Sequence, residues 1–406
     1  MSAAPSAPLQ GLKVVELARI LAGPWIGQTL ADLGADVIKV EAPEGDDTRR
    51  WGPPFILQKD GTNADAAYFH SCNRGKRSVV ADLTTEAGSA FVRGLAREAD
   101  VLIENFKVGG LRKYGLDYET LHALNPRLVY CSVTGFGQSG PYANRAGYDA
   151  MIQAMSGIMD ITGEPDGSPQ KMGVAFADIF TGLYGVIAIQ AALAARERNG
   201  HGQHIDMALL DCMVAVLANQ ALNYLVSGVS PQRLGTAHPN IAPYQVFPVR
   251  DGNIMLAVGN DAQFRRVCEI LEQPALSSDP RYADNASRVA NRATLIPLLS
   301  TAFGSHARDE ILARLEAQGV PAGPINSVRD AFADPQIQYR ELALRLACSW
   351  AHGGSIPGVR TPIRFSESAL ATGRPSPRLG EHTEAVRQHR FDTPGATEAR
   401  PGSSVV

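Results

Sequence analysis

Short apolar segments alternate with longer amphipathic segments along the first half of the chain. The apolar segments are rich in β-branched residues, which is typical of strands buried on both faces of a sheet. They lie at 12–18, 36–41, 78–83, 100–106 and 127–134. Between them, WIGQTLADLG, ended by Gly34 as a C-cap, and TEAGSAFVRGLAREA have the period of helices. This alternation predicts an α/β fold whose parallel sheet has helices on both sides and binds ligands at the carboxyl ends of its strands.

The second half of the chain changes in composition at 228–253. This segment, GVSPQRLGTAHPNIAPYQVFPVRDGN, is rich in Gly, Pro and Asn and indicates a domain boundary. A strand, NIMLAVGN, and several charged amphipathic helices follow as far as about residue 320, and they predict a smaller α+β domain. The polar, Pro- and Gly-rich residues 392–406 are expected to be a disordered tail.

One carboxylate stands alone in an apolar segment. In GVAFADIFTGLYGVIAIQAAL, residues 173–193, Asp178 is surrounded by apolar and small residues. A buried, unpaired carboxylate costs several kcal/mol, so Asp178 is expected either to cap a helix over 179–196 or to act as a reagent. The uncharged run Ile179–Ala195 is at the lower limit of membrane-spanning length, but it is solitary and contains polar residues and glycines. We therefore expect a core helix there.

Composition and charge favour a small-molecule ligand. The chain has 406 residues, 45% of them hydrophobic, with 38 Lys and Arg against 41 Asp and Glu, which gives a net charge of −3. This balance indicates neither a nucleic acid nor a membrane surface as a partner. Five dispersed cysteines without a C-x-x-C pair predict no metal site, no disulfide framework and a reducing compartment. The first ten residues do not resemble a secretory signal, so we expect a cytoplasmic protein.

A glycine motif at 135–140, GFGQSG, follows a predicted strand where a dinucleotide fingerprint would lie. Pro141 and YANRAG follow it instead of a helix, and no strand ending in an acidic residue comes about 20 residues later. Without a helix N-terminus, the pyrophosphate of a dinucleotide would lack its dipole site. The chain also has no G-x-S-x-G or H-E-x-x-H motif. These absences argue against a nicotinamide enzyme and the common hydrolases.

Six further segments occur in a characteristic order: LARILAGPWIGQTLADLGADVIKVE, GDDTRRWGPPF, NRGKRS, GYDAMIQAMSG, DIFTGLYG and GTAHPNIAPYQVF. Together they resemble the class III CoA-transferases, the family of the formyl-CoA and carnitine CoA-transferases, from about residue 9 to 390. RLGTAHPNIAPYQVF followed by VGNDAQF is most similar to the succinate/glutarate branch. The resemblance implies transfer of CoA from an acyl-CoA such as succinyl-CoA to a dicarboxylate such as glutarate. The CoA thioester would be a substrate, with no permanently bound cofactor.

The resemblance also implies a set of site residues. Asp178 corresponds to the catalytic nucleophile, which forms mixed-anhydride and aspartyl-CoA intermediates. Tyr148 and Asp149 would line the reacting end. A dicarboxylate also requires a cation for its distal carboxylate, and Arg19, Arg145, Arg233 and His238 lie in predicted loops that could supply it. Positions that would contact CoA are Leu21, Ala22, Asp82, Leu83, Thr84, Asn105, Phe106, Lys107 and Lys113. Ala42 replaces an arginine of the formyl-CoA enzymes, so either another cation such as Arg49, Arg74 or Arg77 replaces it or the CoA phosphates are held less tightly.

Two other functions remain possible from the sequence. The 2-methylacyl-CoA racemases of the same family carry a histidine where this chain has Tyr148, and tyrosine is a poor acid/base substitute for histidine near neutral pH. A non-catalytic CoA-binding protein would fit only if Asp178 were inert. Covalent labelling of the protein by acyl-CoA distinguishes a transferase from the latter.

The resemblance further implies a domain organisation and a homodimer. Residues 9–224 would form the first part of a large, Rossmann-like CoA-binding domain, and 225–327 a linker and the small domain. Residues 328–391 would return to complete the large domain. In family members two such chains interlock, and two long, proline-containing linkers in this sequence would permit the same arrangement.

Overall fold

The computed structural model describes residues 6–392, and its internal contacts divide the chain into two compact units. Unit 1 comprises the described residues up to Ile158, Met172–Val226, and those from Pro335 onwards. Unit 2 comprises Met159–Lys171 and Ser227–Asp334. The tail predicted to be disordered, 392–406, lies outside the described residues except for Asp392.

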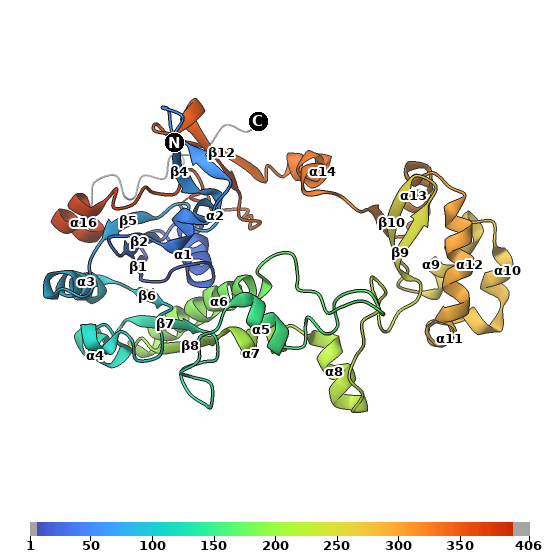
Figure 1. Cartoon of the computed structure of the whole chain (residues 1–406), viewed down its shortest axis with the longest axis horizontal. Coiled ribbons are helices and arrows are strands. Elements are labelled where there is room, and N and C mark those ends of the chain that lie inside the picture. Colours follow the sequence, from blue (N-terminus) through green and yellow to red (C-terminus); the bar gives the residue numbers. More distant parts are fainter. Residues whose placement is uncertain (1–5, 393–406) are drawn as a thin grey trace. The chain divides into compact units, whose positions relative to one another are not determined.

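Unit 1 is built on a six-stranded sheet with strand order β5-β2-β1-β6-β7-β8, in which all neighbouring strands are parallel (Figure 1). The strands are β1 (Lys13–Glu16), β2 (Asp36–Glu41), β5 (Arg77–Val80), β6 (Val101–Glu104), β7 (Val129–Thr134) and β8 (His204–Ala208). The first five coincide with the apolar segments of the sequence. Their central residues, such as Val14, Val15 and Leu102, are completely buried. The predicted parallel sheet is therefore confirmed.

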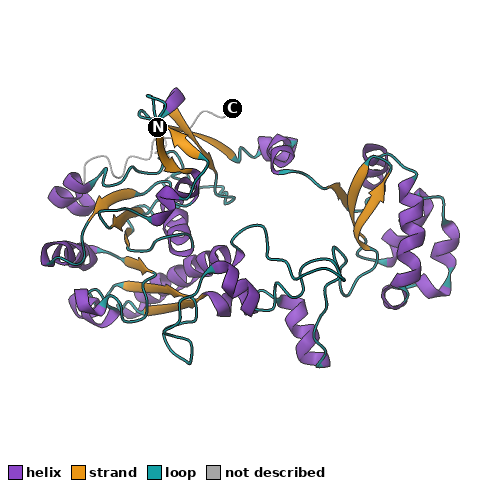
Figure 2. Cartoon of the chain, in the orientation of Figure 1, coloured by secondary structure: helices purple, strands orange, loops and turns teal. Residues whose placement is uncertain are grey.

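Helices cover both faces of this sheet (Figure 2). One face packs against α1 (Ala22–Asp32), α5 (Asp149–Met155), α6 (Phe176–Asn199) and α7 (Leu209–Ala215). The other packs against α3 (Glu86–Glu98), α4 (Tyr118–Leu124) and α16 (Thr383–His389). After α1 the chain turns at Gly34, whose φ of +103° favours glycine. The α/β architecture predicted from the alternating pattern is thus present.

The remaining elements of unit 1 are short. Two antiparallel hairpins, β3 (Phe55–Leu57) with β4 (Asn63–Ala66) and β12 (Ala343–Ala347) with β13 (Ser355–Val359), are joined by a bridge between Gln58 and Ala351. The other helices are α2 (Ala67–Ser71), α8 (Ala218–Ser227), α15 (Pro335–Tyr339) and the 3-10 turns η1 (Asp47–Arg50), η2 (Arg112–Tyr114), η4 (His352–Gly354) and η5 (Arg390–Asp392).

Unit 2 has its own core and a three-stranded antiparallel sheet of order β11-β10-β9. Its strands are β9 (Tyr244–Val249), β10 (Gly252–Ala257) and β11 (Ala322–Pro324). Its helices are α9 (Asp261–Ile270), α10 (Pro274–Ser278), α11 (Asn285–Ala290), α12 (Arg292–Gly304), α13 (Arg308–Ala317) and α14 (Val328–Ala333), with the 3-10 turn η3 (Pro280–Tyr282). Phe247, Phe264 and Phe303 lie in its core.

Helix α6 is buried on one side only. Its inner side approaches α1 closely: a Cβ atom on Gly182 would lie 3.0 Å from Cδ1 of Trp25, and one on Gly185 would collide with Ile26. This packing explains the glycines of the predicted core helix. Among the described residues, α6 is also long and apolar enough to cross a membrane, with a mean hydropathy of 1.6, a property that core helices share. Helices α7 and α8 are long and apolar enough to cross a membrane only when they are taken together, and a bend of 74° separates them.

Candidate active site

Asp178 lies in the first turn of α6, and it does not cap the helix. The helix begins at Phe176, with Ala175 at the cap position and no hydrogen bond from a capping side chain of its own. The expected helix start at Ile179 is therefore wrong by three residues. The error has a physical cause, because the acceptor that caps α6 comes from a different helix.

The acceptor that caps α6 is Asp149, the first residue of α5. Its Oδ1 accepts hydrogen bonds from the backbone N–H groups of Ala177 (2.8 Å) and Asp178 (3.4 Å). Its Oδ2 accepts one from Nε2 of Gln153 (2.7 Å). The structure thus brings together two predicted site residues, Asp149 and Asp178, which are 29 residues apart in the sequence.

Gln153 was not identified from the sequence, although it lies within the quoted GYDAMIQAMSG segment. Its side chain is completely buried, and its Oε1 accepts the backbone N–H of Met172 at 2.9 Å. The amide therefore holds Asp149 on one side and the chain that leads into α6 on the other. A lone glutamine on a short helix gives no sequence signal for this role.

The carboxyl group of Asp178 is electrostatically unusual. Burial, and secondarily the charge of Asp149, raise its pKa from 3.8 to about 7. Burial, and secondarily the charge of Asp178, raise the pKa of the Tyr68 phenol to about 12, so Tyr68 and Asp178 interact electrostatically. The Tyr68 ring packs edge-on against Trp51, with 5.3 Å between ring centroids. Sequence reasoning missed Tyr68, which precedes the apolar residue Phe69 and the buried His70 on α2.

The residues predicted to contact CoA follow three strands at the carboxyl edge of the sheet. Asp82, Leu83 and Thr84 come after β5, where Oδ1 of Asp82 accepts the N–H (2.9 Å) and the hydroxyl (2.6 Å) of Thr84. Asn105, Phe106 and Lys107 come after β6, and Leu21 and Ala22 come after β1. Lys113 lies in η2, with its Nζ 4.7 Å from the ring centroid of Tyr114.

Arg19 and Asn105 meet between β1 and β6. Oδ1 of Asn105 accepts the backbone N–H of Arg19 at 2.9 Å, and Nδ2 donates to the carbonyl of Arg19 at 2.7 Å. In the order β5-β2-β1-β6-β7-β8 the chain reverses direction across the sheet between these two strands. Such a switch point is where open parallel sheets bind ligands.

The loop between β1 and α1 rests on buried charges. Glu16, Lys39 and Lys76 are completely buried. Nζ of Lys39 donates to Glu16 (3.1 Å) and to the carbonyl of Ala18 (2.8 Å). Nζ of Lys76 donates to Glu16 (2.9 Å) and to the carbonyl of Pro24 (2.8 Å). These lysines hold the loop at Ala18 and the first turn of α1 at Pro24, on either side of Leu21 and Ala22.

The three arginines expected to replace the cation missing at Ala42 are buried in ion pairs inside unit 1. Arg49 pairs with Glu41 (2.7 Å) and Asp65 (2.6 Å). Arg74 pairs with Asp32 (2.5 Å), and the Nε of Arg77 donates to Asp36 (2.8 Å). In this structure all three guanidinium groups are engaged by carboxylates, and a contact between one of them and CoA phosphates stays a prediction. Linear sequence did not reveal these pairs, because their partners come from other elements.

The candidate residues for a distal carboxylate fall in both units. In unit 1, the exposed Arg19 pairs with Asp47 at 2.9 Å, and Arg145 lies 4.5 Å from the ring centroid of Tyr142. In unit 2, Arg233 pairs with Asp160 at 3.2 Å. His238 accepts the N–H of Asn240 at Nδ1 (3.1 Å), and its ring centroid is 5.2 Å from that of Tyr244.

The glycine motif at 135–140 belongs to a loop that closes on itself just before Tyr148, whose side chain is 68% exposed. A Cβ atom on Gly135 would lie 2.6 Å from Cα of Gly147, so the two backbones touch at the base of the loop. No helix follows Gly140, as predicted, and the next helix is α5. Gly135 and Gly147 are needed for this close contact, because neither position has room for a Cβ atom.

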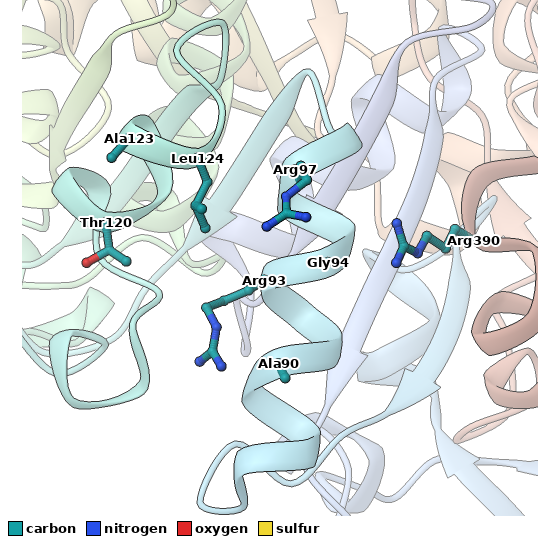
Figure 3. A pocket seen from close by; sticks show the side chains of 8 residues that line it. All are labelled: Ala90, Arg93, Gly94, Arg97, Thr120, Ala123, Leu124 and Arg390. Atoms are coloured by element: carbon teal, nitrogen blue, oxygen red, sulfur yellow. The ribbon is translucent and has the colours of Figure 1, made fainter.

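A separate groove of about 630 Å³ lies between α3 and α4 (Figure 3). Arg93 and Arg97 of α3 and Arg390 line it, and Arg93 and Arg390 are paired with Glu86 and Glu98. None of the residues predicted to contact CoA is among its lining residues. No group of three or more His, Cys, Asp or Glu side chains that could hold a metal ion occurs in the part of the chain that the structure describes.

Comparison with known proteins gives a consistent result. Residues 9–383 match the family described as CoA-transferase family III. The chain is 61% identical to the succinate–glutarate CoA-transferase of Agrobacterium fabrum, over 93% of this chain and 94% of the relative. It is 43% identical to the succinyl-CoA:glutarate CoA-transferase of Homo sapiens, over 95% and 87%. A crystal structure of a CAIB/BAIF family protein from Brucella suis matches with a TM-score of 0.83 and 62% identity, covering 95% of this chain and 99% of that one.

Proposed function

The chain belongs to CoA-transferase family III, and from this premise we propose that it moves CoA from succinyl-CoA to glutarate with Asp178 as the nucleophile. The observation that most supports the role of Asp178 is its environment. It is a desolvated carboxylate in the first turn of a helix, held beside a second carboxylate. The choice of substrates is supported by the similarity to the bacterial and human glutarate transferases.

The reaction proceeds through covalent states of Asp178. Its carboxylate attacks the thioester carbonyl of succinyl-CoA, the C–S bond breaks, and a mixed anhydride forms with release of the CoA thiolate. The thiolate attacks the aspartyl carbonyl, which releases succinate and leaves an aspartyl-CoA thioester. Glutarate then attacks this thioester and expels the thiolate. The thiolate finally attacks the glutaryl carbonyl of the new anhydride, giving glutaryl-CoA and the original carboxylate.

In this proposal CoA binds across the carboxyl ends of β1, β5 and β6. Leu21 and Ala22 offer backbone groups where the loop after β1 joins α1, a junction fixed by Lys39 and Lys76. The exposed side chains of Lys107 and Lys113 supply positive charge for the phosphates, which lysine binds as a point charge. This placement follows the general rule for open parallel sheets and the family resemblance of these positions.

We further propose that two chains form an interlocked dimer, as the family resemblance implies. Support comes from large apolar side chains that are exposed on α6 and α8. On α6 they include Leu183, Tyr184 and Ile187, the last 61% exposed. On α8 they include Leu225, 72% exposed, and Val226, 83% exposed. Side chains of this size and exposure are typical of surfaces that a second copy covers.

A screen of acceptor acids with succinyl-CoA as donor tests the proposed substrates. Product thioesters are identified by mass spectrometry, and kcat/KM is measured for glutarate, oxalate and formate. Glutarate is expected to give the highest value of the three. A higher kcat/KM for oxalate than for glutarate would refute the substrate assignment. Exchange of the α-proton without any CoA transfer would instead favour a racemase.

A further inference from the structure

The N-terminus of α6 is capped by a charge that does not belong to α6. The free N–H groups of a helix N-terminus ordinarily stabilise a carboxylate in the first turn. Here the N–H groups of Ala177 and Asp178 donate to Asp149 instead. The Asp178 carboxylate therefore lies beside a helix terminus whose donors are already used by a second anion.

Two groups interact electrostatically with Asp178: Asp149 on α5, whose Oδ1 accepts the Asp178 N–H, and Tyr68 on α2. From α1, the side that meets α6 near Gly182 is formed by the Ala22 carbonyl and Trp25, which have no charge. Asp149 is thus the anion whose repulsion acts on Asp178 when Asp178 is ionised. The repulsion disappears when Asp178 becomes neutral.

Covalent chemistry is one way for Asp178 to become neutral. Both the mixed anhydride and the aspartyl-CoA thioester replace the carboxylate by an uncharged acyl group. We propose that Asp149 is a positioning residue whose charge favours these covalent states of Asp178 over the free carboxylate. This inference rests on the proposed function, since it assumes that Asp178 is acylated during transfer.

Gln153 fixes the orientation of the Asp149 carboxylate. Its Nε2 donates to Oδ2 of Asp149 while its Oε1 accepts the N–H of Met172, so the amide cannot turn over without losing a hydrogen bond. Asp149 accepts hydrogen bonds from three donors, which suits an ionised carboxylate. The buried amide therefore keeps the negative charge pointed at the first turn of α6.

The test compares two equilibria in the full-length enzyme and its Asp149→Asn variant. The first is the protonation midpoint of Asp178, followed by the carboxyl band in infrared difference spectra against an Asp178→Asn background. The second is the fraction of protein carrying CoA after mixing with succinyl-CoA and a fixed concentration of succinate, measured by intact-protein mass spectrometry. Because the same repulsion acts in both, a midpoint lowered by one pH unit should accompany a roughly tenfold smaller equilibrium constant for covalent CoA.

Matched variants separate this role from a structural one. Asp211→Asn removes an exposed carboxylate from the first turn of the neighbouring helix α7 and should leave both equilibria unchanged. The double variant Asp149→Asn/Gln153→Glu exchanges the amide and the carboxylate, so an amide can still donate to a carboxylate. The negative charge moves from position 149 to position 153, one side chain further from Asp178. We expect its two equilibria to lie between those of the wild type and Asp149→Asn. It also provides the test if the single variant does not fold.

The outcomes are distinct. An unchanged midpoint in folded Asp149→Asn, or a shifted midpoint with an unchanged covalent equilibrium, overturns the proposal. A purely structural role would lower stability and kcat without linked shifts in the two equilibria. If wild-type enzyme forms no covalent adduct, the proposed function fails. The infrared midpoint then still reports whether Asp149 acts on Asp178.

Discussion

Asn105 and Arg19 are joined by a reciprocal pair of hydrogen bonds between one side-chain amide and one backbone peptide group. The two residues come from loops that follow neighbouring strands, β6 and β1, at the point where the strand order reverses. The amide thereby fixes the distance between the two loops proposed to hold CoA, without itself having to contact the ligand.

Replacing this amide should weaken CoA binding. Asn105→Ala removes two hydrogen bonds worth about 1 kcal/mol each, so KM for succinyl-CoA should rise by up to roughly thirtyfold while kcat changes little. Initial-rate kinetics at saturating glutarate measure both constants. Asn199→Ala is the control, because Asn199 makes a similar local bond to the N–H of His201 at the far end of α6. Equal KM values for the Asn105 variant and wild type would contradict the role of Asn105 in holding the two loops together.

Removing the nucleophile should abolish transfer. Asp178→Ala is expected to retain less than about a thousandth of the wild-type rate, because no covalent intermediate can form. Hydroxylamine added during turnover of wild-type enzyme should convert Asp178 to a hydroxamate, identified by peptide mass spectrometry. A folded Asp178→Ala variant with a substantial rate, or a hydroxamate at another carboxylate, would show that the chemistry lies elsewhere.

The raised pKa of Asp178 predicts that the nucleophile destabilises the fold. Burial and Asp149 raise this pKa to about 7, so at pH 8 the folded state carries the full cost of a desolvated anion, and below pH 4 it carries none. Asp178→Asn should therefore raise the free energy of unfolding at pH 8 by up to about 4 kcal/mol. At pH 5 the gain should be less than half as large. Urea titrations at the two pH values give the comparison, and a pH-independent gain would contradict the electrostatic cause.

His70 predicts a loss of stability in acid. It is buried on α2, and burial, followed by the charge of Arg49, lowers its pKa from 6.5 to about 4. As pH falls through this window, the unfolded chain binds a proton that the folded chain does not, so up to about 3 kcal/mol of stability is lost. His70→Leu should lose less stability between pH 7 and pH 4.5 than wild type. His352→Leu, at an exposed histidine, should follow wild type in the same thermal unfolding series.

The interlocked dimer predicts resistance to dilution. Because linked chains cannot separate without unfolding, mass photometry at low nanomolar concentration should still record a particle of about twice 43.3 kDa. The double variant Ile187→Glu/Leu225→Glu places charges on the exposed apolar sides of α6 and α8. It should lower the yield of folded dimer rather than produce a stable monomer. Detection of a folded 43 kDa species from either protein would contradict interlocking.

The sheet was predictable because its signal is local. In the run 100–106, residues 101–103 (Val-Leu-Ile) are apolar at successive positions, which is typical of a strand covered on both faces. The site was predictable where the family resemblance supplied it. Its supporting contacts were not, because they join distant segments: Asp149 caps a helix 27 residues away, and Arg74 pairs with Asp32. Such pairings depend on how the elements pack, and a single sequence does not encode them in any local pattern.

The touching backbones of Gly135 and Gly147 have a consequence for how this protein can vary. Because the loop is closed at its base, and Gln138 near its start is held by Asp206 of β8, the chain leaves and rejoins the fold at nearly the same point before it enters α5. We therefore expect changes of length within this loop to leave Asp149 in place. For the same reason it is a suitable graft point for engineering, whereas an alanine at either glycine would force the loop open and disturb α5.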